Sequence, residues 1–136
     1  IHTAADDKSY DYYTGDIVIP AQITYQGQEY QVVEIAASAF CSCSIDSITL
    51  PEGLVTIGNR AFDYCTNLRF VDMPDTVNDL RHGAFAGCTG LTSVIIPNNV
   101  TEIGYSAFRD PIPATVCLLL YAGCKVAHSS VFRTGI

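Results

Sequence analysis

The chain has 136 residues, of which 49% are hydrophobic and 15% charged, and it carries a formal net charge of −7 at pH 7. This length and composition predict a single folded domain over residues 1–136 with a continuous apolar core, and they exclude a disordered chain. Only seven Lys and Arg residues are spread along the sequence, so nucleic acid, whose recognition needs clustered cations, is not an expected partner. No segment approaches the roughly 20 apolar residues of a membrane-spanning helix, so no membrane span is expected in this chain.

The first 31 residues predict an N-terminal cap on the repeats that follow. Residues 15–20 are expected to form an opening strand that ends at Pro20. Residues 23–30 alternate apolar and polar side chains around Gln26-Gly27, which is typical of a β-hairpin. We expect this hairpin to close the open end of the core. Five tyrosines are interpreted as aromatic capping residues of that end: Tyr10, Tyr12, Tyr13, Tyr25 and Tyr30.

A phrase of 22 or 23 residues recurs over residues 32–108. Each copy ends in an Ala-Phe pair and carries aliphatic residues five and eight positions before its phenylalanine. A period of about 20 to 29 residues with aliphatics at this spacing is typical of leucine-rich repeats, whose coils bury their apolar sides only by stacking. We therefore predict an α/β, β-rich fold, namely a right-handed leucine-rich repeat solenoid of about four coils of ~23 residues. The repeated phenylalanines are Phe40, Phe62, Phe85 and Phe108.

Each coil is expected to hold one strand that ends at a proline, and a short helical turn at its Ala-Phe pair. The phenylalanine of that turn is expected to fill the space between coils. Along the last three residues of each strand the side chains should alternate between the core and solvent. The predicted strands are Ile45–Leu50, Leu68–Met73 and Leu91–Ile96. The residues expected to face the core are Ile48, Leu50, Val71, Met73, Val94 and Ile96.

The six cysteines do not by themselves indicate a disulfide framework. Cys43, Cys65 and Cys88 occupy one repeat position and are interpreted mainly as small core residues, because a thiol is only a weak hydrogen-bond donor. Cys117 and Cys124 are a candidate pair, but their spacing alone leaves the pairing open. The histidines are scattered and no paired C-x-x-C spacing is present, so we expect no metal site and no cofactor.

The phrase Ile-Gly-x-x-Ala-Phe-x-x-Cys-x-x-Leu-x-x-Val-x-Ile-Pro resembles the BspA-like leucine-rich repeat family of bacterial cell-surface proteins. Residues 109–136 depart from the phrase at 110–113, which predicts an irregular last coil. Residues 122–132 then resemble the closing helical segment of that family. The resemblance implies an extracellular or cell-surface protein whose repeats adhere to host proteins or to other cells. The given chain itself begins without an export signal.

Catalysis is not expected, because the sequence has no nucleophile elbow, phosphate-binding glycine loop or zinc-protease motif. We therefore assign no catalytic residue. The densest acidic run is Asp72, Asp75 and Asp79, and it is interpreted as solvated surface rather than as a carboxylate pair or calcium loop. His82 falls at a variable position of the repeat and is likewise interpreted as a surface residue.

The outward positions of the strands form the candidate binding face. Phe70 and Ile95 in neighbouring coils, together with Val18 on the opening strand, are apolar and expected to be exposed. They are either isolated surface hydrophobics or a contact patch for a protein or glycan. We thus predict a non-enzymatic binding module, with a self-associating scaffold unit and an accessory carbohydrate-binding unit as alternatives. The candidate ligand-binding residues are Ser47, Thr49, Phe70, Asp72, Ser93 and Ile95, with Asp16 and Val18 beside them.

Overall fold

The computed structural model describes residues 13–109 and 117–120, and these form strands and turns with no helix. The strands are β1 (Thr14–Val18), β2 (Gln22–Tyr25), β3 (Gln28–Gln31), β4 (Glu34–Ile35), β5 (Ser44–Thr49), β6 (Thr56–Ile57), β7 (Phe70–Asp72), β8 (Asp79–Leu80), β9 (Ser93–Ile96), β10 (Glu102–Ile103) and β11 (Cys117–Leu120).

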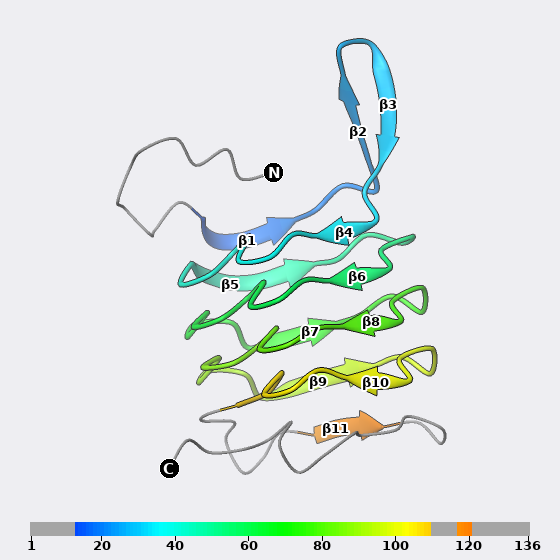
Figure 1. Cartoon of the computed structure of the whole chain (residues 1–136). Helices are drawn as coiled ribbons and strands as arrows, with labels where there is room; N and C mark the ends of the chain where they lie inside the picture. Colours follow the sequence, from blue (N-terminus) through cyan, green and yellow to red (C-terminus); the bar gives the residue numbers. More distant parts are fainter. Residues whose placement is uncertain (1–12, 110–116, 121–136) are drawn as a thin grey trace.

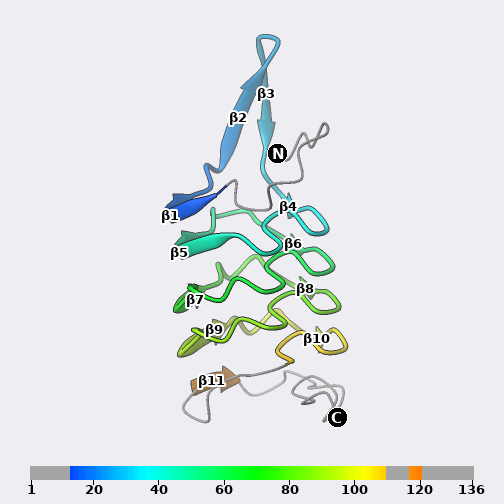
Figure 2. The same cartoon turned by 90° about the vertical axis from the view of Figure 1, so that its left-hand side faces the viewer.

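The chain forms a stack of coils in which strands from successive repeats lie in two columns (Figures 1 and 2). One column is a parallel sheet of four strands in the order β10-β8-β6-β4. The other column holds β1, β5, β7, β9 and β11, whose pairs are also parallel. Strands β5, β7 and β9 are the three predicted from the repeat, and each is followed within two residues by its proline. The opening strand β1 also forms as predicted.

The second column is interrupted between β5 and β7. Strands β1 and β5 form one sheet and β7, β9 and β11 form another, although β5 and β7 lie side by side (Figures 1 and 2). Just before β7, the amide of Arg69 donates to the carbonyl of Asp46 over 3.4 Å, a long hydrogen bond. The interruption coincides with the shortest copy of the repeat. Only Ser44 separates Cys43 from Ile45, whereas Thr66 and Asn67 separate the next cysteine from its leucine.

The apolar core runs through the whole stack, because each repeat contributes the same inward positions. All six strand residues predicted to face the core are buried, and so are the four repeated phenylalanines. The phenylalanine rings form a column, with centroid separations of 5.3, 5.1 and 5.6 Å between neighbours and nearly parallel planes. This offset stacking confirms that the phenylalanines fill the space between coils.

The helical turns predicted at the Ala-Phe pairs do not form. The residues two positions before and two positions after Phe40, Phe62 and Phe85 have left-handed backbone angles, with φ between 56° and 69°, and Ser106, two positions before Phe108, has a φ of 55°. This alternation directs every second amide out of its own coil: Phe40 donates to the carbonyl of Ala61, and Phe62 to that of Ala84, each over 2.8 Å. In a helix these amides would donate within their own coil. Here hydrogen bonds between coils replace the helical hydrogen bonds.

The repeated cysteines do more than fill the core. The thiol of Cys65 donates to the carbonyl of Phe40, and that of Cys88 to the carbonyl of Phe62, each over 3.0 Å. Both thiols are buried, and this desolvation raises their pKa, that of Cys88 to about 12. Cys41, Cys65 and Cys88 are free cysteines.

The predicted hairpin forms, but the structure does not confirm that it closes the core. Strands β2 and β3 pair antiparallel around Gln26 and Gly27, whose φ angles of 50° and 77° suit a tight two-residue turn. The hairpin projects away from the stack (Figures 1 and 2), and its Tyr25 and Tyr30 are exposed. Tyr13, in contrast, packs on Phe40 with ring centroids 5.1 Å apart, as a capping residue should.

Several predictions concern residues outside the described ranges. They are the irregular coil at 110–113, the helical segment at 122–132, the pairing with Cys117 of Cys124, which lies outside the ranges, and the capping roles of Tyr10 and Tyr12. Within the ranges that the structure describes, no helix is long and apolar enough to cross a membrane.

Candidate binding cleft between β5 and β7

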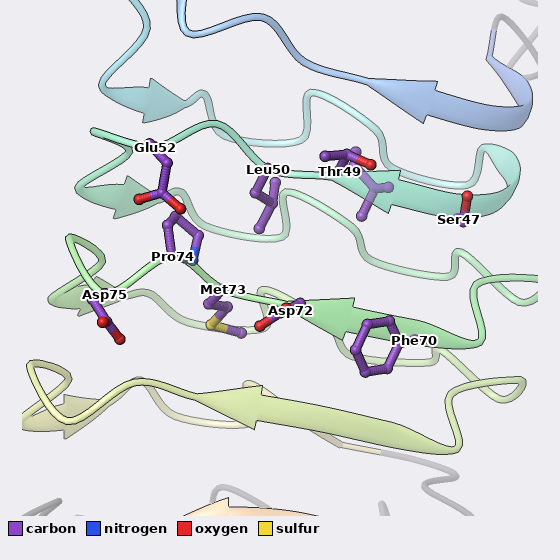
Figure 3. Close-up of a pocket in the computed structure, with 10 residues that line it drawn as sticks. Ser47, Thr49, Leu50, Glu52, Phe70, Asp72, Met73, Pro74 and Asp75 are labelled. Atoms are coloured by element: carbon purple, nitrogen blue, oxygen red, sulfur yellow. The ribbon is translucent and has the colours of Figure 1, made fainter.

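A cleft of about 560 Å³ opens where the ladder between β5 and β7 is interrupted (Figure 3). It includes four of the six residues predicted to bind a ligand: Ser47, Thr49, Phe70 and Asp72. Its lining is completed by residues from the same two strands and from the turns after them. The full set is Ser47, Ile48, Thr49, Leu50, Glu52, Phe70, Asp72, Met73, Pro74 and Asp75.

The floor of the cleft is apolar and fixed by the core. Leu50, Met73 and Pro74 line the cleft although each is buried, and the first two are inward positions of the repeat. Their side chains are held by packing within the stack, so the floor is formed before any ligand arrives.

One end of the cleft carries an exposed aromatic ring. Phe70 lies there near Ser47, and 43% of its surface is exposed (Figure 3). The hydroxyl of Ser47 donates to Asp16 Oδ1 over 2.6 Å, which ties this end of β5 to β1. The Phe70 ring therefore lies near the hydrogen bond that holds β5 against β1.

The cleft is acidic along the rest of its length. Glu52 and Asp75 follow the prolines that end β5 and β7, and lie at the end opposite Phe70, with Asp72 between (Figure 3). These three residues are exposed, and no Lys or Arg lines the cleft. The ion pairs of the described residues join Arg60 to Asp63 and Arg81 to Glu34 and Asp79, and so involve none of these carboxylates.

Ser93 and Ile95 do not line this cleft. They lie one coil further on, in β9, where both are half-buried. Our expectation that Ile95 is exposed was wrong, because β9 is paired on both sides: Ile95 lies opposite Asp72 of β7 and opposite residue 119 of β11. Val18, in contrast, is 71% exposed, as expected.

Glu52 and Asp75 are the site residues that the sequence interpretation missed. Both follow a repeated proline, and that shared position is the signal that could have placed them on one rim of adjacent coils. The alternation of the strands could not reveal them, because both lie beyond the strand ends.

The remaining polar candidates behave as surface residues. Asp79 lies on β8, in the other column, where its carboxylate accepts from Arg81 Nε over 2.9 Å. The acidic run is therefore divided between two faces, and no three His, Cys, Asp or Glu residues within the described ranges are grouped to hold a metal ion. His82 is exposed and stacks on Tyr105 with ring centroids 5.4 Å apart.

The stacked coils, the repeated core positions and the open strand face define a leucine-rich repeat protein, a class that is generally protein-binding. The family model described as the BspA type leucine rich repeat region matches residues 16–118 in six copies. The chain belongs to this BspA-type leucine-rich repeat family.

Solved structures of similar proteins support the fold. A leucine-rich repeat protein from Bacteroides ovatus ATCC 8483 is 32% identical with a TM-score of 0.66, over 76% of this chain and 29% of that one. The T. pallidum leucine-rich repeat protein is 30% identical with a TM-score of 0.65, over 81% of this chain and 52% of that one. A leucine rich cell surface protein from Faecalibacterium prausnitzii A2-165 is 26% identical with a TM-score of 0.52, over 76% of this chain and 35% of that one.

This chain thus spans about a third to a half of the length of these three similar proteins. No curated protein matches it.

Proposed function

We propose that this chain is a non-enzymatic binding module of a bacterial cell-surface or secreted protein, and that it binds a protein or glycan partner through the strand face. The observation that carries the proposal is the cleft between β5 and β7, which combines a fixed apolar floor with an exposed Phe70. Exposed aromatic rings beside formed hollows are typical of binding hot spots.

The place of action and the type of partner rest on similarity. One similar structure is that of a leucine rich cell surface protein, which supports a location outside the cell. Repeat stacks of this class present their strand residues in register, as an extended surface that suits a macromolecular partner. We propose that the stacked coils form the right-handed solenoid expected from the repeat, and that the cleft lies on its strand face.

The test is an array screen of the purified chain against extracellular-matrix proteins and glycans, run in parallel with three variants. Phe70→Ala removes the exposed ring of the cleft, and Ile95→Ser changes the next strand. Tyr105→Ala is the matched control, because that ring is 52% exposed but lies on the turn after β10. We expect a bound partner to be lost with Phe70→Ala, kept with Tyr105→Ala, and weakened less by Ile95→Ser.

Self-association as a scaffold unit is the second candidate, and the N-terminal end of the stack favours it. An apolar cavity of about 400 Å³ lies there, lined in part by Val18, Ile23 and Phe40, and the exposed hairpin is adjacent to it. If the arrays give no partner and light scattering shows concentration-dependent association that Val18→Asp abolishes, the binding-module proposal is replaced by this one.

A further inference from the structure

We infer that the β5–β7 cleft receives a lysine or arginine side chain from an extended basic segment of a protein partner. This inference deepens the proposed function and rests on it, because it names the chemistry of the partner at the same site. Three observations carry it: the apolar floor, the aromatic ring and the unpaired carboxylates, which occur together in one hollow.

The floor suits the aliphatic part of a basic side chain. Lys and Arg carry long apolar stems that pack along apolar surfaces while the charged head stays near water or a counter-charge. Leu50, Met73 and Pro74 supply such a surface inside the cleft. A short polar ligand would leave this floor uncovered.

The rim suits the charged head. Asp72 lies between the ring of Phe70 at one end and Glu52 and Asp75 at the other (Figure 3). A cation beside this row meets an aromatic face and a carboxylate at the same time, and cation–π attraction and charge-assisted hydrogen bonds favour the same group. No described residue supplies that cation, since the ion pairs of the described residues leave these three carboxylates without one.

The elongated arrangement favours a side chain over a compact ion. The three carboxylates come from two different turns and one strand, and no grouping of metal-binding residues is found within the described ranges. A guanidinium or ammonium group on a flexible stem can contact a spread row of this kind.

Charge complementarity identifies a protein segment as the occupant. The formal net charge of −7 attracts basic partners at a distance. On the strands that flank the cleft, the outward positions Val18 of β1 and Ser93 of β9 are uncharged, and the backbone on either side of a basic side chain can lie along them.

The experiment uses the full chain and two capped octapeptides, one alternating serine with arginine and the other alternating serine with citrulline. Citrulline keeps the shape of arginine and removes its charge. Binding is followed by amide chemical shifts in NMR titrations at low and high salt. The protein is compared with the Glu52→Gln/Asp72→Asn double variant, with Phe70→Leu, and with a Glu102→Gln control. Glu102 is an exposed carboxylate on β10, in the other column, so its change tests charge without touching the cleft.

We expect the arginine peptide to shift the amides of Ser47, Phe70 and Asp72 and to bind about tenfold more weakly to the double variant, since hydrogen bonds to charged groups are the stronger kind. Phe70→Leu should weaken binding, Glu102→Gln should not, and the citrulline peptide should cause no such shifts. Equal binding of both peptides, unchanged binding to the double variant, or shifts outside the cleft would overturn the inference. Spermidine binding as tightly as the peptide would also overturn it, in favour of a free polyamine.

Failure here is separable from failure of the proposed function. An array partner that depends on Phe70 but is unaffected by Glu52→Gln/Asp72→Asn leaves the binding module intact and overturns only the basic side chain. If the arrays give no partner whose binding depends on Phe70, both the proposed function and the inference are overturned.

Discussion

The column of phenylalanine rings predicts a specific pattern of energetic coupling between repeats. Phe62 stacks on Phe40 at 5.3 Å and on Phe85 at 5.1 Å, with interplanar angles of 2° in both pairs. Phe62 and Phe85 are therefore direct neighbours, whereas Phe40 and Phe85 are separated by the ring of Phe62. A double-mutant cycle with phenylalanine-to-leucine changes tests whether stability passes between coils through these contacts.

The magnitudes follow from counting ring pairs. Each stacked pair contributes about 0.5–1.5 kcal/mol beyond area burial, so Phe62→Leu, which removes two pairs, should cost about 1–3 kcal/mol. Phe85→Leu should cost a similar amount, because Phe85 also stacks on Phe108 at 5.6 Å. Both single changes remove the 62–85 pair, so the double variant should be less unstable than the sum by about 0.5–1.5 kcal/mol.

The assay is urea unfolding followed by far-ultraviolet circular dichroism and tyrosine fluorescence, since the chain has eight Tyr and no Trp. The matched control is the Phe40/Phe85 cycle, whose two residues share no ring pair and should add within about 0.3–0.5 kcal/mol. Equal coupling in the two cycles, or additivity in both, would refute the view that direct ring stacking joins the coils. The dependence of the unfolding free energy on urea should stay the same across the set, as required for comparing the variants.

Two further predictions concern buried titratable groups. Asp63 is buried, its Oδ1 has no hydrogen-bond partner among the described residues, and desolvation raises its pKa despite Arg60, Arg109 and His82 nearby. The folded state therefore holds this proton more tightly than the unfolded state, and stability is lost as pH rises through the range between the unfolded and the folded pKa. Asp63→Asn should raise the melting temperature at pH 7 but not at pH 3; an equal change at both pH values would contradict this. For the thiols, site-resolved alkylation of the native protein at pH 8 should modify half-exposed Cys41 well before Cys65 and Cys88, whose raised pKa and burial suppress the reactive thiolate. Equal rates at the three cysteines would contradict that reasoning.

The coils and their core were predictable because equivalent positions of successive copies carry the same type of residue. A single aliphatic residue is weak information, but Val71 and Val94 share one position in successive copies, and both are fully buried. Repetition thus replaced the homologous sequences that would otherwise be needed to identify an inward position. The hairpin was predictable for a local reason, since Gln26-Gly27 accommodates the left-handed angles of its turn.

The turn at each Ala-Phe pair was not predictable from local preference. The residue two positions before the phenylalanine is Ser38, Arg60, Gly83 or Ser106, and only the glycine signals a left-handed backbone. The cost of that conformation at serine and arginine is offset by hydrogen bonds to the next coil, such as that from the amide of Arg60 to the carbonyl of His82 at 2.9 Å. A backbone hydrogen bond between two coils cannot be predicted from the sequence of either coil alone.

The candidate site was predictable in its strand residues and not beyond them. Alternation along a strand identified Ser47, Thr49, Phe70 and Asp72 as outward, and the structure brings these four into one cleft. Alternation also gave Ile95 correctly as an outward position, but it did not predict that the residue is half-buried, because exposure of an outward residue also depends on the strands that flank it. The rule also gave no information about Glu52 and Asp75, which lie in turns.

The cleft lies beside the shortest copy of the repeat, and there is a physical reason for this association. In a perfect stack, each strand satisfies the backbone groups of its neighbour and each coil covers the side of the next, which leaves little space between strands. The first copy is one residue shorter than those after it, and next to it the ladder between β5 and β7 is absent. The buried repeat residues Leu50 and Met73 still form the floor there, while Glu52 and Phe70 are free to differ between copies. The regular positions thus build the scaffold, and the departure from regularity opens the space in which the variable residues can contact a partner.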